Sequence, residues 1–265
     1  MIPGPISGRD MLIYCAAAAC AVAVVIVASR LVKKVSGAVD DPAPDGPTAS
    51  HTGAMLSALF LLAFAIAVVV PWTMADAARS NTYTESQAIT EASWAAGRLP
   101  APDARHVREG LSEYVDLVRG SEWRLMREGR LEERGWTQLD DLRRYVMAVE
   151  PEDEELKEAR EGLLGHLGEI AAARRQRAMD ARTTPPAGLY AVTVVTGVAV
   201  VLLPFMAGAR PRGMTLVPLS LMAALLAAGT YLTVDIAQVF SGAMAIGPDA
   251  FTSVQGELHR IAGGG

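Results

Sequence analysis

Four long apolar segments constrain the fold of this chain more than any other feature of its sequence. They run over Met11–Ser29, Ala54–Trp72, Ala187–Ala209 and Met214–Val234. A helix needs about 20 apolar residues to cross the hydrocarbon core of a bilayer. A single segment in that core can pair all of its backbone N–H and C=O groups only as a helix. The sequence therefore predicts an all-α polytopic membrane protein with four transmembrane helices.

The composition supports this prediction and narrows the functional classes. Of 265 residues, 51% are hydrophobic and 20% are charged, which argues against a cytosolic enzyme with one buried core. The net charge of −5 provides no basic field, so nucleic acid is not an expected partner. Both cysteines lie in the first apolar segment, which excludes a disulfide scaffold and a cysteine-based zinc site.

A cleaved signal peptide is the alternative interpretation of the first segment. Its apolar run is long for a signal peptide, and no small-x-small cleavage site precedes Arg30. We therefore expect residues 1–35 to hold the first span and its flanks. Residues 36–52 are rich in Pro, Gly, Asp and Ser and are predicted to be a flexible loop, and residues 53–75 hold the second span.

Residues 76–186 are the candidate helical-bundle domain. They contain 17 basic and 22 acidic residues, and so carry the whole net charge. Their apolar positions recur at helical spacing without two-residue alternation, which predicts four amphipathic helices and no sheet. The first should continue from the second span to about Ala96. The other helix starts are predicted at an N-cap Asp103, at a capping box of Thr137 and Asp140, and at Pro151 in a first turn.

The remaining segments complete the predicted organisation. Residues 187–235 hold the third and fourth spans, and residues 236–265 form a tail with a short amphipathic helix. That helix should start after Gly247-Pro248-Asp249, with Phe251, Val254, Leu258 and Ile261 on one face. We expect this face to pack against the bundle or to lie at the membrane interface.

Basic residues in the short loops predict the orientation in the membrane. Three follow the first span (Arg30, Lys33 and Lys34), and Arg210 and Arg212 lie between the third and fourth spans. The positive-inside rule places both turns in the cytoplasm. The chain is therefore predicted to be a multi-pass protein of the bacterial inner (cell) membrane with its helical domain extracytoplasmic. Arg174, Arg175, Arg177 and Arg182 approach the third span and favour the opposite orientation.

Several short motifs follow one another along the chain. Tyr83-Thr84-Glu85 and Ile89-Thr90-Glu91-Ala92 follow the second span, and Tyr114, Glu122-Trp123 and Met126 form a Y…EW..M pattern. Arg174 to Pro186 forms an R..R…P pattern, and Asp235, Phe240, Gly242, Pro248 and Phe251 form a D..F.G…P.AF pattern. In this order the motifs resemble a bacterial family of four-span membrane proteins of unknown function, called bestrophin-like.

The resemblance implies a homo-oligomer and an ion channel, because true bestrophins form rings of subunits around one pore. This sequence departs from them in two respects. Bestrophins have a cytosolic helical region, whereas the basic turns here place the domain outside. No neck lined by Phe and Ile can be identified either.

Four carboxylates flank the spans and are the candidate site residues. Asp76, Glu85 and Glu91 follow the second span, and Asp235 follows the fourth. They could form a carboxylate ring at a pore mouth, which would favour cations. Alternatively they pair with Arg79, Arg98 or Arg182 at the membrane surface. Asp235 is the best single candidate, because an acid at the end of an apolar span is costly unless it is paired or hydrated.

No motif indicates catalysis, a metal site or a cofactor. The four histidines are never three or four residues apart, and no phosphate-binding glycine loop is present. The acidic run Glu150–Glu155 suits the start of a helix better than a calcium loop. We therefore expect no enzyme. Two functions stay open: an oligomeric pore, or a membrane-anchored sensing or interaction module whose helical domain meets a protein partner.

Overall fold

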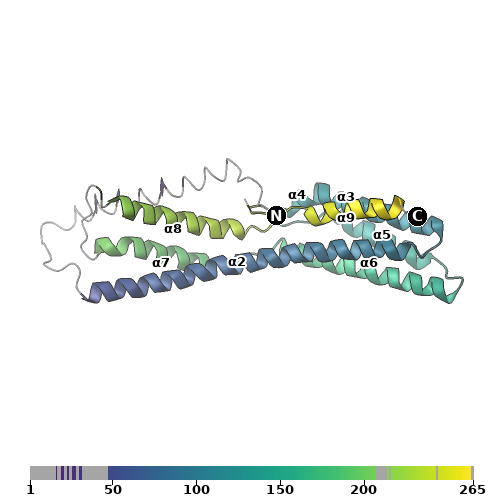
Figure 1. Ribbon diagram of the computed structural model, residues 1–265, viewed down its shortest axis with the longest axis horizontal. Helices are drawn as coiled ribbons and strands as arrows, with labels where there is room; N and C mark the ends of the chain where they lie inside the picture. Colours follow the sequence, from purple (N-terminus) through teal and green to yellow (C-terminus); the bar gives the residue numbers. More distant parts are fainter. Residues whose placement is uncertain are drawn as a thin grey trace. The chain divides into compact units, whose positions relative to one another are not determined.

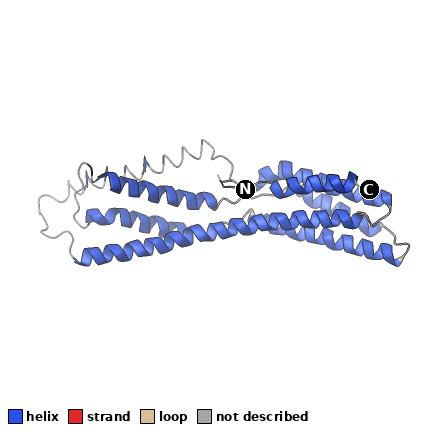
Figure 2. Cartoon of the chain, viewed as in Figure 1, coloured by secondary structure: helices blue, strands red, loops and turns tan. Residues whose placement is uncertain are grey.

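The computed structural model describes residues 47–206, 216–242 and 244–263, together with residue 214 and eight residues between 16 and 31. In this part of the chain the regular structure is helical, and no strand occurs (Figures 1 and 2). The predicted all-α class is confirmed. Three of the described helices are long and apolar enough to cross a membrane. The first predicted span, Met11–Ser29, lies largely outside the described residues, so the count of four spans stays a prediction.

The chain divides into two compact units. The span unit comprises Met1–Thr73, Thr184–Gln238 and Gly242–Met244. The helical domain comprises Met74–Thr183, Val239–Ser241 and Ala245–Gly265.

Helix α2, Pro47–Ala96, contributes residues to both units. It ends where the sequence predicts, before the turn at Gly97. It begins at Pro47, so the last six residues of the predicted loop 36–52 are helical. Proline suits the first position of a helix because its backbone has no N–H to leave unsatisfied there.

The span unit contains the first part of α2 with α7 (Ala187–Met206) and α8 (Leu216–Ile236). Two phenyl rings of α2 lie against glycines of these helices. A Cβ at Gly197 would lie 3.2 Å from the Phe60 ring, and one at Gly229 would lie 2.8 Å from the Phe64 ring. The two rings stack with centroids 5.6 Å apart. Small residues therefore allow the helices to approach closely, as is common between transmembrane helices.

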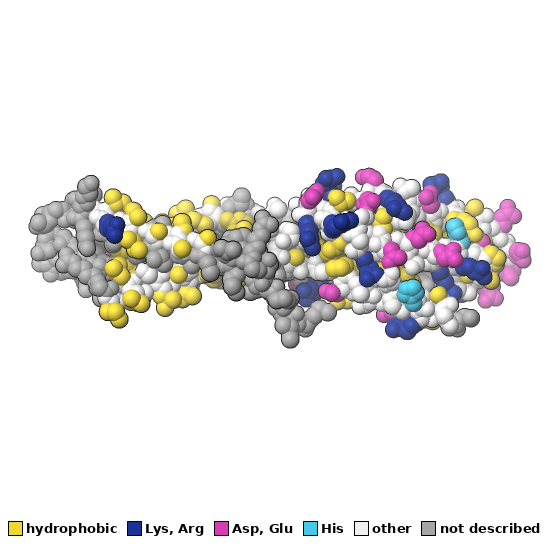
Figure 3. All heavy atoms as spheres, turned by 90° about the horizontal axis from the view of Figure 1, so that it is seen from above, with side chains coloured by type: hydrophobic (Ala, Val, Ile, Leu, Met, Phe, Trp, Pro, Cys, Tyr) yellow, Lys and Arg dark blue, Asp and Glu magenta, His cyan; other side chains and the backbone are white. Residues whose placement is uncertain are grey.

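The helical domain adds shorter helices to the second part of α2. These are α3 (Ala101–Leu117), the π-helix η1 (Val118–Glu122), α4 (Trp123–Met126), α5 (Glu133–Ala148), α6 (Glu154–Asp180) and α9 (Asp249–Gly263). One apolar core joins them, and Phe251, Val254 and Leu258 of α9 are part of it. The tail helix therefore packs into the bundle. Acidic and basic side chains are interspersed over the face of this domain in Figure 3.

Three predicted helix starts differ from the structure. Helix α3 begins at Ala101 after Pro100, so Asp103 lies in its first turn. Helix α5 begins at Glu133 rather than at Thr137, because the Glu122 carboxylate accepts from the backbone N–H of Glu132 at 3.1 Å and fixes an earlier start. Pro151 precedes α6, whose N-cap is Asp153. The Asp153 carboxylate accepts from the Leu156 N–H at 2.7 Å.

Candidate functional site

Five polar side chains form a network at the centre of the helical domain. They are Glu85 on α2, Tyr114 on α3, Glu122 at the end of η1, and Arg174 and Arg177 on α6, and each is 0% exposed. Apolar core residues such as Ile89, Leu111 and Ile170 are equally buried. Charged groups in such surroundings are costly unless each is paired and hydrogen-bonded. The contacts of these five side chains therefore decide whether the core is stable.

Each arginine of the network holds a carboxylate with two nitrogens. Arg177 donates from Nε to Glu85 Oε2 at 2.7 Å and from Nη2 to Glu85 Oε1 at 3.0 Å. Arg174 donates from Nη1 to Glu122 Oε1 at 2.7 Å, and its Nη2 bonds Glu122 Oε2. Arg177 Nη1 lies 2.8 Å from Glu122 Oε1 and links the two pairs. Two guanidinium groups and two carboxylates thus make a closed cluster with no net charge.

Tyr114 connects the two ion pairs through its hydroxyl group. The hydroxyl donates to Glu85 Oε1 at 2.5 Å and accepts from Arg174 Nη1 at 3.2 Å. Burial, followed by the negative charge of Glu85, raises the pKa of Tyr114 above the ordinary value of 10.0. The stability that the neutral phenol provides is therefore present below about pH 10 and falls as the pH rises above it.

The arginines are held by their aromatic and backbone neighbours as well. Arg174 Nη2 donates to the Glu132 carbonyl at 2.7 Å, and its Cζ lies 4.8 Å from the Trp136 ring centroid. Arg177 lies over Phe251 of α9 at 5.3 Å. Burial alone would lower the pKa of Arg177, but the charge of Glu85 and its hydrogen bonds outweigh burial and raise it. Both arginines are therefore charged at any physiological pH.

The π-helix places Glu122 in the network. A π-turn inserts one extra residue into a helix, and such turns are frequent at functional sites. The next residue, Trp123, donates from Nε1 to the Ile246 carbonyl at 3.3 Å. Its ring meets Phe240 and Phe251 edge to face at 5.7 and 5.9 Å. Glu122 thus faces the ion pairs, while its neighbour holds the segment that leads into α9.

The structure brings together residues from each of the sequence motifs in the helical domain. Glu85, Tyr114 and Glu122 belong to the network, Trp123 packs on Phe240 and Phe251, and Met126 Sδ lies 3.0 Å from Arg177 Nη1. Arg174 and Arg177, which are not among the candidate site residues predicted from the sequence, supply the positive charges. The sequence could have indicated that these two arginines are buried. Leu163, Leu167 and Ile170 form a buried stripe on α6, and Arg174 and Arg177 continue it at helical spacing.

The remaining candidate carboxylates lie elsewhere. Asp76 and Glu91 are exposed on α2, about 13 and 9 Å along the helix from Glu85. Glu85 pairs with Arg177 rather than with Arg79, Arg98 or Arg182. Asp235 belongs to the span unit, is 6% exposed, and accepts at its backbone carbonyl from the Gln238 N–H at 3.1 Å. A Cβ at Gly242 would collide with this carbonyl, which explains the glycine.

Within the described residues, no group of three His, Cys, Asp or Glu side chains is placed to hold a metal ion. Pro248 lies directly before α9, and its carbonyl accepts from the Thr252 N–H at 2.9 Å. The network joins α2, α3, η1 and α6. Its carboxylates and guanidinium groups form ion pairs with one another and are not exposed to water.

Gly135 provides a test of how rigidly the network is held. A Cβ there would lie 2.5 Å from Arg174 Cζ and 2.7 Å from Nη1. Since the guanidinium group is held by Glu122, Gly135→Ala should destabilise the domain by about 1–3 kcal/mol. A Cβ at Gly162 on α6 meets nothing within 4 Å, so Gly162→Ala should stabilise it by about 0.5–1 kcal/mol through helix propensity. Thermal unfolding would show whether the melting temperature falls in Gly135→Ala and rises in Gly162→Ala. A higher melting temperature in Gly135→Ala would contradict the rigid packing.

Comparison with known proteins assigns the chain to a family. The model of the bestrophin-like domain matches residues 15–251, which include the described spans, the whole buried network and the start of α9. No curated protein and no solved structure matches the chain. The chain belongs to the bestrophin-like family.

Proposed function

We propose that this membrane protein is a homo-oligomeric ion channel whose spans, contributed by several copies, surround a shared pore. The observation that carries the proposal is the exposure of the span unit. Only 11% of the most apolar window of α2, 22% of that of α7 and 11% of that of α8 is buried within the chain. These surfaces need lipid or further copies of the chain to cover them, and bestrophin-like proteins are generally oligomeric.

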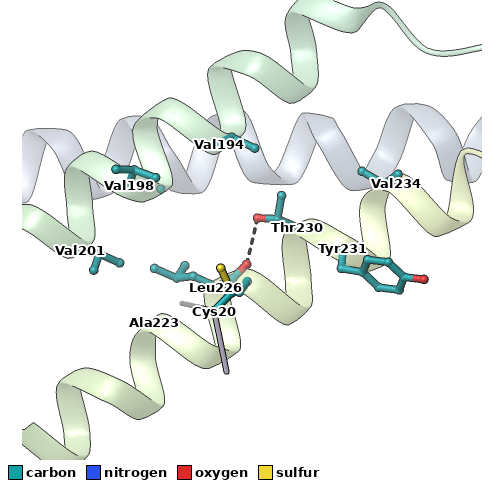
Figure 4. Close-up of a pocket in the computed structure, with 11 residues that line it drawn as sticks. Cys20, Val194, Val198, Val201, Ala223, Leu226, Thr230, Tyr231 and Val234 are labelled. Atoms are coloured by element: carbon teal, nitrogen blue, oxygen red, sulfur yellow. Dashed lines mark hydrogen bonds between the residues drawn. The ribbon is translucent and has the colours of Figure 1, made fainter. Parts of the chain in front are cut away.

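A single chain offers ions no polar path through its described spans. A cavity of about 410 Å³ is lined by residues of α7 and α8 together with Cys20, and its walls are mostly valine, leucine and alanine (Figure 4). The Thr230 hydroxyl, one of the few polar groups there, donates to the Leu226 carbonyl at 2.9 Å. Such a lining offers an ion few ligands in place of its hydration shell. A conducting path would therefore form between chains, with an apolar constriction that gates by dewetting.

The mass of the purified protein in detergent, corrected for bound detergent, tests the assembly. A closed ring of four or more subunits would support the proposal and justify flux measurements in liposomes. A monomer would remove the shared pore and favour the second candidate function, a membrane-anchored sensing module. The observation that favours that function is a cavity in the helical domain with two arginines in its wall, Arg105 and Arg108.

Asp76 is the exposed carboxylate with which to test the predicted pore mouth. Asp76→Asn should lower the permeability of potassium relative to chloride in liposomes, because a negative charge near a pore attracts cations. Asp140→Asn is a matched control, since Asp140 is exposed on α5 and has no ion pair among the described residues. Equal effects of the two variants would remove Asp76 from the pore mouth.

We also propose that the helical domain is extracytoplasmic, as the basic turns predict. Single cysteines at Ser80→Cys and Ser36→Cys, in a background without Cys15 and Cys20, should react oppositely with an impermeant thiol reagent. Ser80 is exposed on α2, so its label reports the side of the helical domain. Labelling from outside at position 36 alone would invert the orientation.

A further inference from the structure

The helical domain contains a cavity of about 600 Å³ that none of the network residues lines. It lies where the end of α2, the first half of α3 and the last turns of α9 meet. Two arginines of α3, Arg105 and Arg108, line it together with Ser93 and Gly97 of α2 and its following turn. Its apolar wall includes Leu99 and Leu258.

Arg108 is held in position with unused donors. Its Nε donates to the Ser93 carbonyl at 3.2 Å, which fixes the plane of the guanidinium group. Gly97 makes room for this group, because a Cβ there would lie 2.5 Å from Nη2. Within the described part of the chain, neither Nη1 nor Nη2 of Arg108 has an acceptor, and Arg105 one turn earlier has no ion pair. A guanidinium group with free terminal nitrogens is suited to carboxylate or phosphate.

The Ser93 hydroxyl is an unpaired polar group next to the two arginines. Ser93 is 1% exposed, and its Oγ has no hydrogen-bond partner among the described residues. Threonine hydroxyls of α2 bond carbonyls of their own helix, as Thr84 does to Ser80 and Thr90 to Ser86, whereas the buried Ser86 Oγ, like that of Ser93, is unpaired within the described chain. Since buried polar atoms are nearly always paired, a ligand group that reaches this hydroxyl from the cavity would satisfy it.

The start of α3 adds a favourable potential at the same cavity. Its N-cap is Pro100, whose side chain cannot cap the helix, and Ala101 lines the cavity. The N–H of a first helical residue has no acceptor inside the helix, and the helix dipole makes this end positive. The acidic residue of this turn, Asp103, accepts from the Tyr145 hydroxyl at 2.7 Å, so its carboxylate is held by α5.

We propose that this cavity binds a small organic anion, with its carboxylate or phosphate group on Arg105, Arg108 and Ser93 and a short apolar body against Leu99 and Leu258. Glu109 also lines the cavity, so among its Arg and Glu side chains the positive charge exceeds the negative by one. The size suits a ligand of metabolite dimensions. The site does not depend on whether the protein conducts ions.

Calorimetric titration of the full-length protein in detergent would test the site with three probes that share one ring. Benzoate and phenyl phosphate carry the two candidate anions, and benzyl alcohol is neutral. We expect saturable binding of at least one anion, and binding of benzyl alcohol at least about tenfold weaker. The stronger anion identifies the charged group of the ligand. Equal binding of the alcohol, or no saturation by either anion up to about 10 mM, would overturn the proposal.

Variants separate binding from folding. Arg108→Gln should weaken the stronger anion about tenfold, whereas Arg124→Gln, at an exposed arginine on α4, should leave it unchanged. Ser93→Ala removes an unpaired buried hydroxyl, so it should keep or raise the melting temperature of the empty protein and still weaken the anion about threefold. Wild-type affinity in both Arg108→Gln and Ser93→Ala would contradict the assigned residues.

Discussion

Replacing Arg177 by methionine is expected to lower the free energy of unfolding of the helical domain by about 3–5 kcal/mol. Arg177 is 0% exposed and bonds Glu85 through Nε and Nη2. Methionine fills similar volume but leaves the Glu85 carboxylate buried without its cation. Hydrogen exchange of the full-length protein should show core amides of α3 and α6 exchanging about a hundredfold to several thousandfold faster.

Arg175→Met is the matched control for this prediction. Arg175 lies two residues earlier on the same helix, is exposed, and has no ion pair among the described residues. Its replacement should change exchange rates little. Glu85→Met combined with Arg177→Met should restore part of the loss, because removing both charges leaves no uncompensated charge in the core, although the Tyr114 hydroxyl loses its acceptor. A double variant that loses the sum of both single effects would contradict the pairing.

Glu122→Gln is the second replacement with a large expected effect, also about 3–5 kcal/mol. Glu122 neutralises Arg174, lies 2.8 Å from Arg177 Nη1, and accepts from the N–H of Glu132 at the start of α5. The glutamine amide has the same size but no charge. Its NH₂ group would face the N–H groups of Arg174 or Glu132, which are donors themselves. The buried core is then left with one uncompensated positive charge.

The effect of Glu122→Gln should be centred on η1 and the first turn of α5, where hydrogen exchange should rise most. Glu128→Gln is its control, because Glu128 is exposed and its contact with Arg130 is a surface pair of the kind worth about 0–1 kcal/mol. Uniform exchange across the domain in Glu122→Gln would show that this carboxylate does not hold the π-helix.

The sequence predicts those elements that depend on local pattern. Hydropathy locates α2, α7 and α8, and helical periodicity locates the buried faces of α3 and α9. The starts of α3, α5 and α6 were predicted wrongly. For α5 the cause is a contact from outside the helix, the Glu122 carboxylate on the Glu132 N–H. Local pattern does not predict η1 either, since its extra residue is placed by what Glu122 and Trp123 contact.

The network shows a different limit of sequence reasoning. Glu85 and Arg177 are 92 positions apart, and Glu122 and Arg174 are 52 apart. Because Glu85 follows an apolar span, the sequence suggests that it lies at a pore mouth or pairs with an arginine at the membrane surface. In the structure Glu85 is buried in the core of the helical domain. The periodicity of α6 holds the missing information, because a charged residue on a buried stripe requires a partner of opposite charge.

The place of α9 in the core has a consequence for how the protein is made. Phe251 is 0% exposed and lies over Arg177, yet it is synthesised after α7 and α8. When α6 has been synthesised and α9 has not, the apolar groove of the domain that α9 fills is still open. That groove closes only after α7 and α8, which are long and apolar enough to cross a membrane, have been synthesised. Completion of this core therefore follows the synthesis of both of these apolar helices.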